Sequence, residues 1–279
     1  DTGRVLNLMQ IRIAPSLGQL EGHPNDVWGT TDYNNPIDPA VFMGIYGFRH
    51  FFALWNHTGK KYILWCGSDI RHFTNGYWLD DVGEIRLSPT AIAQWIEKNC
   101  ESWVENMAEQ NALLNLGIHS NVCPSFLGNV KDYPISYTHS YRPKVYASVS
   151  GNDFKLYGWD EIERIAGVHP DIEFHLYGNT VPWLTKHPNV VVHGRVPKKQ
   201  MNAEIQTMQA GLRLLPFDGF SEILAKSILW GQWPISFIQY PHIESLGGLD
   251  TLKLAFDPNT AGRDYYLKHL NRFPWNVYA

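Results

Sequence analysis

The sequence predicts an α/β protein with two domains, each built on a parallel β-sheet. Its 279 residues exceed what one small core needs, since domains typically run to ~100–200 residues. From residue 144 onward, short β-prone runs alternate with segments whose apolar residues recur at helical spacing, which is the pattern of successive βαβ units. Apolar residues make up 44% of the chain and charged residues 18%, so the cores can be buried and a disordered chain is excluded.

The elements of the second half follow one another regularly. Strands are expected over residues 144–150, 172–177, 190–193, 212–216 and 234–237. Helices are expected over residues 159–168, 197–208, 221–230 and 258–271. The helix over 159–168 carries acids in its first turn, where the helix dipole favours them, and Pro197 suits the start of the next helix. Ser221 is the expected N-cap of the third helix, and Gly231 marks its end.

The first half is less regular but similar in kind. Strands are expected over residues 5–13, 41–46, 61–66 and 121–125, and helices over 48–57, 91–99 and 106–116. Residues 18–39 are rich in Gly, Pro, Asn and Asp and are expected to form a loop, and the polar stretch 131–143 is the expected linker. We therefore divide the chain into an N-terminal domain over 1–140, a C-terminal domain over 141–258, and a helical segment over 259–279 that packs back on the N-terminal domain.

Charge and cysteine content exclude several functional classes. The net charge of −4 gives no global basic field for nucleic acid or an anionic membrane, although a local basic patch is compatible with it. The three cysteines have neither zinc nor disulfide spacing, which favours a reducing compartment, and we expect the cytoplasm. No apolar run approaches the ~18–20 residues that span a bilayer, and no signal-peptide pattern opens the sequence.

Common catalytic motifs are absent as well. The sequence has no G-x-G-x-x-G, no G-x-x-x-x-G-K-[ST], no H-E-x-x-H and no G-x-S-x-G. It also lacks an Asp-x-Asp triplet, which weighs against a metal-dependent glycosyltransferase. Aromatic residues reach 14% of the chain, and they serve either as core or as the lining of a site for flat or sugar-like ligands.

The most informative stretch is residues 217–236, FDGFSEILAKSILWGQWPIS. Gly219 allows a tight turn, and the amides of residues 219–222 open a helix, where amides and helix dipole favour an anion such as phosphate. Asp218 is placed to accept hydrogen bonds from hydroxyl groups, and Lys226, one turn into the helix, can lean toward its start. Taken singly, these residues are also explained by ordinary capping and by an i,i+4 pair with Glu222, worth ~0.2–0.5 kcal/mol.

This stretch resembles the donor-binding segment of GT-B-fold glycosyltransferases of the retaining, glycogen-synthase-like type. Asp218 matches the first acid of that pattern, residues 219–220 match its Gly-Phe, and Gly231 matches its later glycine. Shorter similarities occur at 65–73, 175–179 and 191–201, so the resemblance covers 170–237 well and 40–240 loosely. It implies two Rossmann-like domains whose parallel sheets face each other across a cleft. It also implies a nucleotide-sugar donor held mainly by the second domain, an acceptor held mainly by the first, and no metal ion or other cofactor.

Two departures from the family pattern concern the donor phosphates. Lys226 stands where the family has its second, ribose-binding acid. The family's Arg and Lys-Gly after the first strand of the second domain are missing from 148–162, where Tyr157-Gly158 takes the Lys-Gly place. We hypothesise that Lys226 neutralises part of the diphosphate. The alternative is that the chain has lost donor binding. From the resemblance, the donor-binding residues are Asp218, Gly219, Phe220, Ser221, Glu222 and Lys226.

Candidates for the transfer chemistry follow two strands of the first half. Glycosyl transfer passes through an oxocarbenium-like state while charge develops on the leaving phosphate. Arg49 and His50 follow one strand and Asp69 follows the next, at the sheet edge where ligands bind, so we predict these as catalytic residues. Arg71 and His72 are the predicted acceptor-binding residues. Each also has a structural explanation, since a lone His is usually packed or solvated and Asp after Gly-Ser is a common helix cap.

The first interpretation is therefore a retaining, metal-independent glycosyltransferase that uses a UDP- or GDP-linked sugar. The alternative is a non-catalytic nucleotide- or carbohydrate-binding protein on the same scaffold, because the usual phosphate cations are missing. A third, weaker interpretation is a glycoside hydrolase that uses paired carboxylates. The acceptor stays open among a glycan, a lipid, a small molecule and a hydroxylated DNA base, the last being used by some viral members of this fold.

Overall fold

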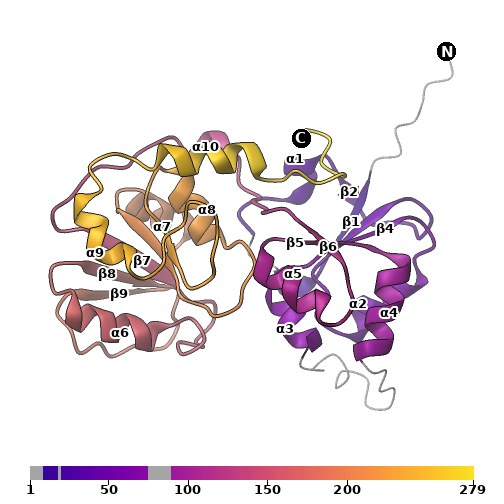
Figure 1. Cartoon of the computed structure of the whole chain (residues 1–279), viewed down its shortest axis with the longest axis horizontal. Helices are drawn as coiled ribbons and strands as arrows, with labels where there is room; N and C mark the ends of the chain where they lie inside the picture. The colour runs from indigo at the N-terminus through magenta and orange to yellow at the C-terminus, as the bar shows by residue number, and fades with distance from the viewer. Residues whose placement is uncertain (1–8, 18–19, 75–88) are drawn as a thin grey trace. The chain divides into compact units, whose positions relative to one another are not determined.

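The computed structural model describes residues 9–17, 20–74 and 89–279, and its contacts divide the chain into two compact units. Unit 1 comprises Asp1–Asn129, Phe217–Phe220 and His269–Ala279. Unit 2 comprises Val130–Pro216 and Ser221–Lys268. Each unit combines one parallel sheet with several helices (Figure 1), as the sequence predicted. The residues expected to form the beginning of the first strand, 5–8, lie outside the described residues.

Unit 1 is built on a parallel sheet. In the described part of this unit the strands are β1 (Gln10–Ile13), β2 (Thr31–Asp32), β3 (Ala40–Met43), β4 (Lys61–Leu64), β5 (Glu101–Val104) and β6 (Ser120–Val122), in the order β2-β1-β3-β4-β5-β6. Its helices are α1 (Pro24–Trp28), α2 (Phe48–Asn56), α3 (Ser68–Thr74), α4 (Pro89–Asn99) and α5 (Met107–Leu114). All four residues of β3 are buried, as expected of a strand covered on both faces.

Four elements of unit 1 differ from the sequence-based expectation. The segment 18–39, expected as a loop, contains α1 and β2, because His23 caps α1 and Pro24 begins it. Gly29 ends α1 in the left-handed region at φ 69°. β5 was not predicted at all, since it is a short strand between two helices that alternates partly exposed and buried residues. The short helix α3 follows directly from the Gly67 turn and was also missed.

Unit 2 follows the predicted alternation closely. Its strands are β7 (Lys144–Ser148), β8 (Glu173–Tyr177), β9 (Val190–Gly194), β10 (Ala210–Arg213) and β11 (Ile235–Ser236), in the order β11-β10-β7-β8-β9. Its helices are α6 (Trp159–Val168), α7 (Lys198–Ile205), α8 (Glu222–Leu229), α9 (Gly248–Thr251) and α10 (Thr260–His269). The predicted linker belongs to this unit, because the amides of Ser136 and Tyr137 both donate to the carbonyl of Trp230.

The strand order identifies one switch point in each sheet. In unit 1 the chain places β2 on one side of β1 and β3 on the other. In unit 2 it continues from β7 through β8 to β9 and then returns to the opposite side of β7 with β10. Open parallel sheets bind ligands beyond the carboxyl ends of their strands at such a point. These two edges are therefore the places to look for a site.

The end of the chain is not one helix. α10 stops at His269, and the segment that follows it packs within unit 1. There the ring of Trp28 meets the rings of Phe273 and Trp275 at centroid distances of 5.4 and 6.2 Å. The side chain of Asn271 bonds both backbone groups of Phe126, which ties this segment to the β6 side of the unit. Among the described residues, no helix has both the length and the hydrophobicity to cross a membrane.

Candidate functional site

The switch point of unit 2 brings a cation next to a helix start. Arg213 ends β10, and its guanidinium carbon lies 4.8 Å from the centre of the Tyr157 ring. Gly158 follows at φ 73° as the N-cap of α6, and a Cβ there would come within 2.7 Å of the Cβ of Leu214. Arg213 therefore lies beside the Tyr157-Gly158 pair that replaces the family's Lys-Gly. Arg213 was not among the predicted site residues, because its signal in the sequence is a single Arg at the end of an apolar strand.

The second helix start in unit 2 is that of α8. The hydroxyl of Ser221 accepts the amide of Leu224 at 3.4 Å, so Ser221 is the N-cap that the sequence predicted. All α8 residues after Glu222 are buried, and the hydroxyl of Ser227 accepts the amide of Gly211 on β10 at 2.9 Å. The helix is thus fixed against the strand that ends in Arg213.

Lys226 lies within unit 2, and its side chain leans back toward the first residue of α8. Only 5% of the residue is exposed, and its Nζ donates to Oδ1 of Asn202 on α7 at 3.1 Å. The nearer carboxylate oxygen of Glu222 is 3.8 Å away. The ammonium group is therefore held between α7 and the start of α8, and part of its charge is already balanced by Glu222.

The predicted donor residues 218–220 belong to unit 1, where residues at the end of β5 hold them. The side-chain amide of Asn106 donates to the carbonyl of Asp218 at 2.8 Å. The amide of Phe220 donates to Oε2 of Glu105, also at 2.8 Å. A Cβ on Gly219 would overlap Oε2 of Glu105, so a larger residue here would force that carboxylate away from the Phe220 amide. The chain passes from unit 1 to unit 2 between Phe220 and Ser221.

A second close approach joins the same segment to the end of β4. Gly67 adopts φ 81°, and a Cβ there would overlap the backbone nitrogen of Gly219. Left-handed backbone without a Cβ is available only to glycine at low cost. Two glycines, Gly67 and Gly219, therefore fix where residues 218–220 lie on unit 1.

Three buried carboxyl groups lie at this edge of unit 1. Burial, with the charge of nearby Asp218 added, raises the pKa of Glu105 to about 8, although bonds from Ser125 and Phe220 oppose the shift. Burial and the Glu105 carboxyl raise the pKa of Glu109 well above its usual range. Burial raises the pKa of Asp69 to about 6. Asp69, predicted as a catalytic residue, is 0% exposed.

The contacts of Asp69 explain its burial. Its carboxylate accepts the amides of Ile45 at 3.0 Å, Cys66 at 2.9 Å and Ile70 at 2.8 Å. The amides of Ile45 and Cys66 lie in the loops after β3 and β4, and that of Ile70 lies in α3, so Asp69 joins the two loops at the start of this helix. The contacts are those of the structural alternative, a carboxylate that satisfies backbone donors at a helix start.

Tyr46 contacts two other predicted site residues near these loops, His50 and His72. The hydroxyl of Ser68 donates to that of Tyr46 at 3.1 Å, and the amide of Tyr46 donates to Nδ1 of His50 at 3.1 Å. The rings of His50 and His72 meet the Tyr46 ring edge to face at 6.5 and 6.0 Å. Burial, with the charge of Arg71 added, lowers the pKa of His72. The structure thus groups His50, Asp69 and His72, while Arg49 lies exposed in the first turn of α2.

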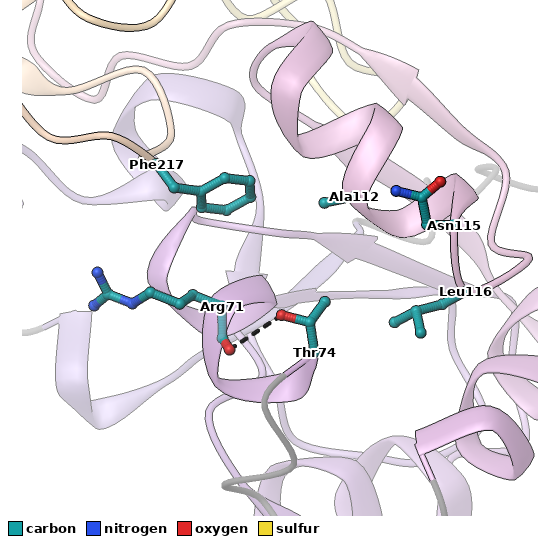
Figure 2. A pocket seen from close by; sticks show the side chains of 6 residues that line it. All are labelled: Arg71, Thr74, Ala112, Asn115, Leu116 and Phe217. Atoms are coloured by element: carbon teal, nitrogen blue, oxygen red, sulfur yellow. Dashed lines mark hydrogen bonds between the residues drawn. The ribbon is translucent and has the colours of Figure 1, made fainter.

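Arg71 lies at a different place, along a pocket of about 450 Å³ between α3 and α5. The pocket is lined by Arg71, Thr74, Ala112, Asn115, Leu116 and Phe217. Figure 2 shows the Phe217 ring and Leu116 on different sides of this space, with Asn115 and Ala112 along the α5 wall. The lining is mostly apolar, with one cation at its edge. The cavity near the switch point of unit 1, beside Arg12 and His50, has only about 10 Å³, too little for a sugar.

No metal centre is formed by the described residues. Within residues 9–17, 20–74 and 89–279, no group of three or more His, Cys, Asp or Glu side chains is arranged to hold a metal ion. In unit 2, three titratable side chains are joined by hydrogen bonds. His175 bonds His193 at 2.8 Å and Glu173 at 2.6 Å.

Comparison with solved structures identifies the class of fold: the two parallel-sheet units are those of GT-B glycosyltransferases. No family model matches the sequence, and no curated protein matches it. The lipopolysaccharide outer core galactosyltransferase WaaB is 12% identical at a TM-score of 0.56, over 85% of this chain and 73% of its own. S. aureus TarM, as a variant bound to fondaparinux, alpha-GlcNAc-glycerol and UDP, is 14% identical at 0.57, over 84% of this chain.

HepE from Anabaena, in complex with UDP-glucose, is also similar, at 9% identity and a TM-score of 0.50, over 80% of this chain and 74% of its own. The chain spans about half the length of TarM, since the match covers 53% of that structure. At these identities the likeness is one of fold. It confirms the fold class and the resemblance that residues 217–236 indicated.

Proposed function

We propose that this protein is a glycosyltransferase that moves a sugar from a nucleotide-diphosphate donor to a hydroxyl acceptor, with retention and without a metal ion. The observation that carries the proposal is the switch point of unit 2, where Arg213 and the start of α6 lie together on a GT-B fold. The similarity to TarM in complex with UDP and to HepE in complex with UDP-glucose supports a UDP-linked donor, with GDP as the alternative.

The donor phosphates need positive potential that does not depend on the missing family residues. Arg213 supplies a guanidinium, whose planar fork suits phosphate oxygens. The starts of α6 and α8 add backbone dipoles that favour an anion. Ser221 and Glu222 begin α8, and we retain them with Asp218, Gly219 and Phe220 as donor residues. Lys226 remains a donor candidate, although its ammonium group already bonds Asn202 and lies beside the Glu222 carboxylate.

The acceptor side of the reaction is assigned to unit 1. We propose that the pocket between α3 and α5 holds part of the acceptor, with Arg71 at its edge. Arg49, His50 and His72 are retained as the groups that meet the acceptor or the leaving phosphate. Asp69 is retained as a residue of the catalytic region, and the contribution we assign to it is to hold the loops that carry Tyr46 and Ser68.

The free thiols of all three cysteines suit the expected cytoplasmic location.

A screen of nucleotide sugars by thermal shift tests the proposal. A ligand present at 100 times its Kd stabilises the folded protein by ~2.7 kcal/mol, which is easily measured. We expect one of UDP-, GDP- and ADP-glucose to raise Tm, and the bound sugar to be transferred or hydrolysed with its anomeric configuration retained, equally well in EDTA. The absence of any stabilisation by the three donors would contradict the proposal.

The second candidate is a non-catalytic binding protein on this fold. The observation in its favour is the loss of the family's Arg and Lys after β7, together with the engagement of Lys226 by Asn202. Donor binding without turnover or hydrolysis, across a panel of glycan, lipid and small-molecule acceptors, would select it over the enzyme.

A further inference from the structure

Two residues at the end of β5 make the contacts that fix the Asp218–Phe220 turn, and they differ in kind. Asn106 donates its side-chain amide to the carbonyl of Asp218 at 2.8 Å. Glu105 accepts the amide of Phe220 on Oε2 at 2.8 Å. Both are buried, at 3% and 7% exposure, in a place where water does not compete for the same groups.

Each of these side chains also serves a second partner in unit 1. Oδ1 of Asn106 accepts the amide of Glu109 at 3.0 Å and so caps α5. Oε1 of Glu105 accepts both the hydroxyl and the amide of Ser125. The end of β5 is thereby tied to α5 and to the segment after β6. Its side chains reach the turn from a rigid base.

The arrangement constrains one short backbone segment from three sides. Asn106 holds its first carbonyl, Glu105 its last amide, and the Gly67 loop lies against its middle. Ordering a backbone residue costs ~1–2 kcal/mol, so a turn without these bonds would sample other conformations.

We propose that Glu105 and Asn106 are positioning residues that hold the Asp218-Gly219-Phe220 turn in the conformation that donor binding requires. This inference rests on the proposed function, because the role of the turn in donor binding comes from there. Neither residue is assigned to the substrate. They act through the backbone of the turn, and their loss lowers the fraction of molecules that is ready to bind. The apparent Kd then rises in inverse proportion to that fraction.

The chain offers a variant that separates the turn from the helix. Ser is as good an N-cap as Asn, so Asn106→Ser keeps the cap of α5 and removes the amide donor to the Asp218 carbonyl, together with its longer bond of 3.4 Å to Oε2 of Glu109. A matched control is Gln110→Ala, which removes a side-chain amide bond of 2.7 Å, to the carbonyl of Ser120, from the same helix. If Asn106→Ser fails to fold, Asn106→Asp replaces it, since Asp also caps a helix and lacks the amide donor.

Two measurements on the full chain make the test. The first is amide hydrogen exchange of the peptide over 217–224 without ligand, and the second is the Kd for UDP-glucose with Tm recorded alongside. We expect Asn106→Ser to speed exchange of the turn by about tenfold while α5 exchanges as in the wild type. We also expect its Kd for UDP-glucose to rise about three- to tenfold, and its Tm to equal that of Gln110→Ala.

The outcomes separate the two claims. Unchanged exchange of the turn in Asn106→Ser would overturn the positioning role, whatever the Kd does. Faster exchange with an unchanged Kd would overturn the link from the turn to the donor. A wild-type chain that binds none of UDP-, GDP- and ADP-glucose would overturn the proposed function instead, and the exchange data would then report on the holding of the turn alone.

Discussion

The carboxyl edges of the two sheets obey the same topological rule but gather opposite chemistry. In unit 1 the edge carries buried carboxyls, Asp69, Glu105 and Glu109, whose oxygens are largely occupied by backbone amides. In unit 2 the edge carries a guanidinium, Arg213, and the starts of two helices. The first arrangement fixes loops, and the second is the one to which we assign the donor phosphates. An acid at a strand end is therefore not by itself evidence of catalysis.

The largest expected effect tests whether the carboxyl groups of unit 1 are structural, and it concerns Asp69. If its carboxylate fixes loops, Asp69→Ala leaves three buried amides without their acceptor, at ~1–3 kcal/mol for each that finds no substitute. We expect a loss of at least ~3 kcal/mol of unfolding free energy, measured by urea denaturation. Asp69→Asn, which keeps one carbonyl oxygen, should lose less. A variant of full stability with no transfer activity would instead show that Asp69 takes the proton.

Substitution of Arg213 tests the carboxyl edge of the unit 2 sheet. Bonds to charged groups contribute ~1.5–3 kcal/mol, so Arg213→Ala should weaken nucleotide-sugar binding by about 10- to 100-fold, measured by calorimetry. Its stability should stay close to that of the wild type. Arg164→Ala is the control, because Arg164 pairs with Glu161 on the surface of α6. Equal donor affinity in the Arg213 and Arg164 variants would remove Arg213 from the site.

The pH dependence of stability tests whether the buried carboxyl Glu105 of unit 1 is protonated in the folded protein. The folded pKa of Glu105 is raised to about 8, so its stabilising effect is complete below its unfolded pKa near 4.5 and is lost as pH rises toward about 8. We expect Tm to fall across this window with a slope equivalent to at most ~1.4 kcal/mol per pH unit from this group. Glu105→Gln should flatten the slope. An equally steep slope in that variant would assign the effect to Asp69 or Glu109.

Lys226 gives the smallest expected effect on the donor. Because its Nζ is bonded to Asn202, Lys226→Met should change the Kd for UDP-glucose by less than about threefold, against about tenfold for a lost bond worth 1.4 kcal/mol. A tenfold or larger rise in Kd with little loss of Tm would restore the hypothesis that this lysine neutralises the diphosphate.

Much of the fold could be predicted because its signals are local. The strands of unit 2 are apolar runs ended by Gly or Pro, and a single residue, Ser221, indicates the start of α8. The elements that the sequence did not predict also have local causes. β5 has only four residues, half of them partly exposed, and α1 hides in a stretch whose Pro and Gly are a helix start and stop and not loop residues.

The site was less predictable because its contacts are distant in sequence. Glu105 meets Phe220 across 115 positions and Asn106 meets Asp218 across 112, and no spacing rule reports such pairs. Residues 217–220 looked like part of the donor domain, yet their contacts place them in unit 1. Arg213 was hidden for a different reason, since a single Arg in a strand gives no motif until the topology places it at the switch point.

The central claim, that a nucleotide sugar binds at the carboxyl edge of unit 2, is tested most directly by hydrogen exchange with and without saturating nucleotide sugar. We predict that peptides over 150–160 and 213–226 become protected by the donor, while the peptide over α10 does not change. Protection confined to other segments, or no protection with any of UDP-, GDP- and ADP-glucose, would contradict the account.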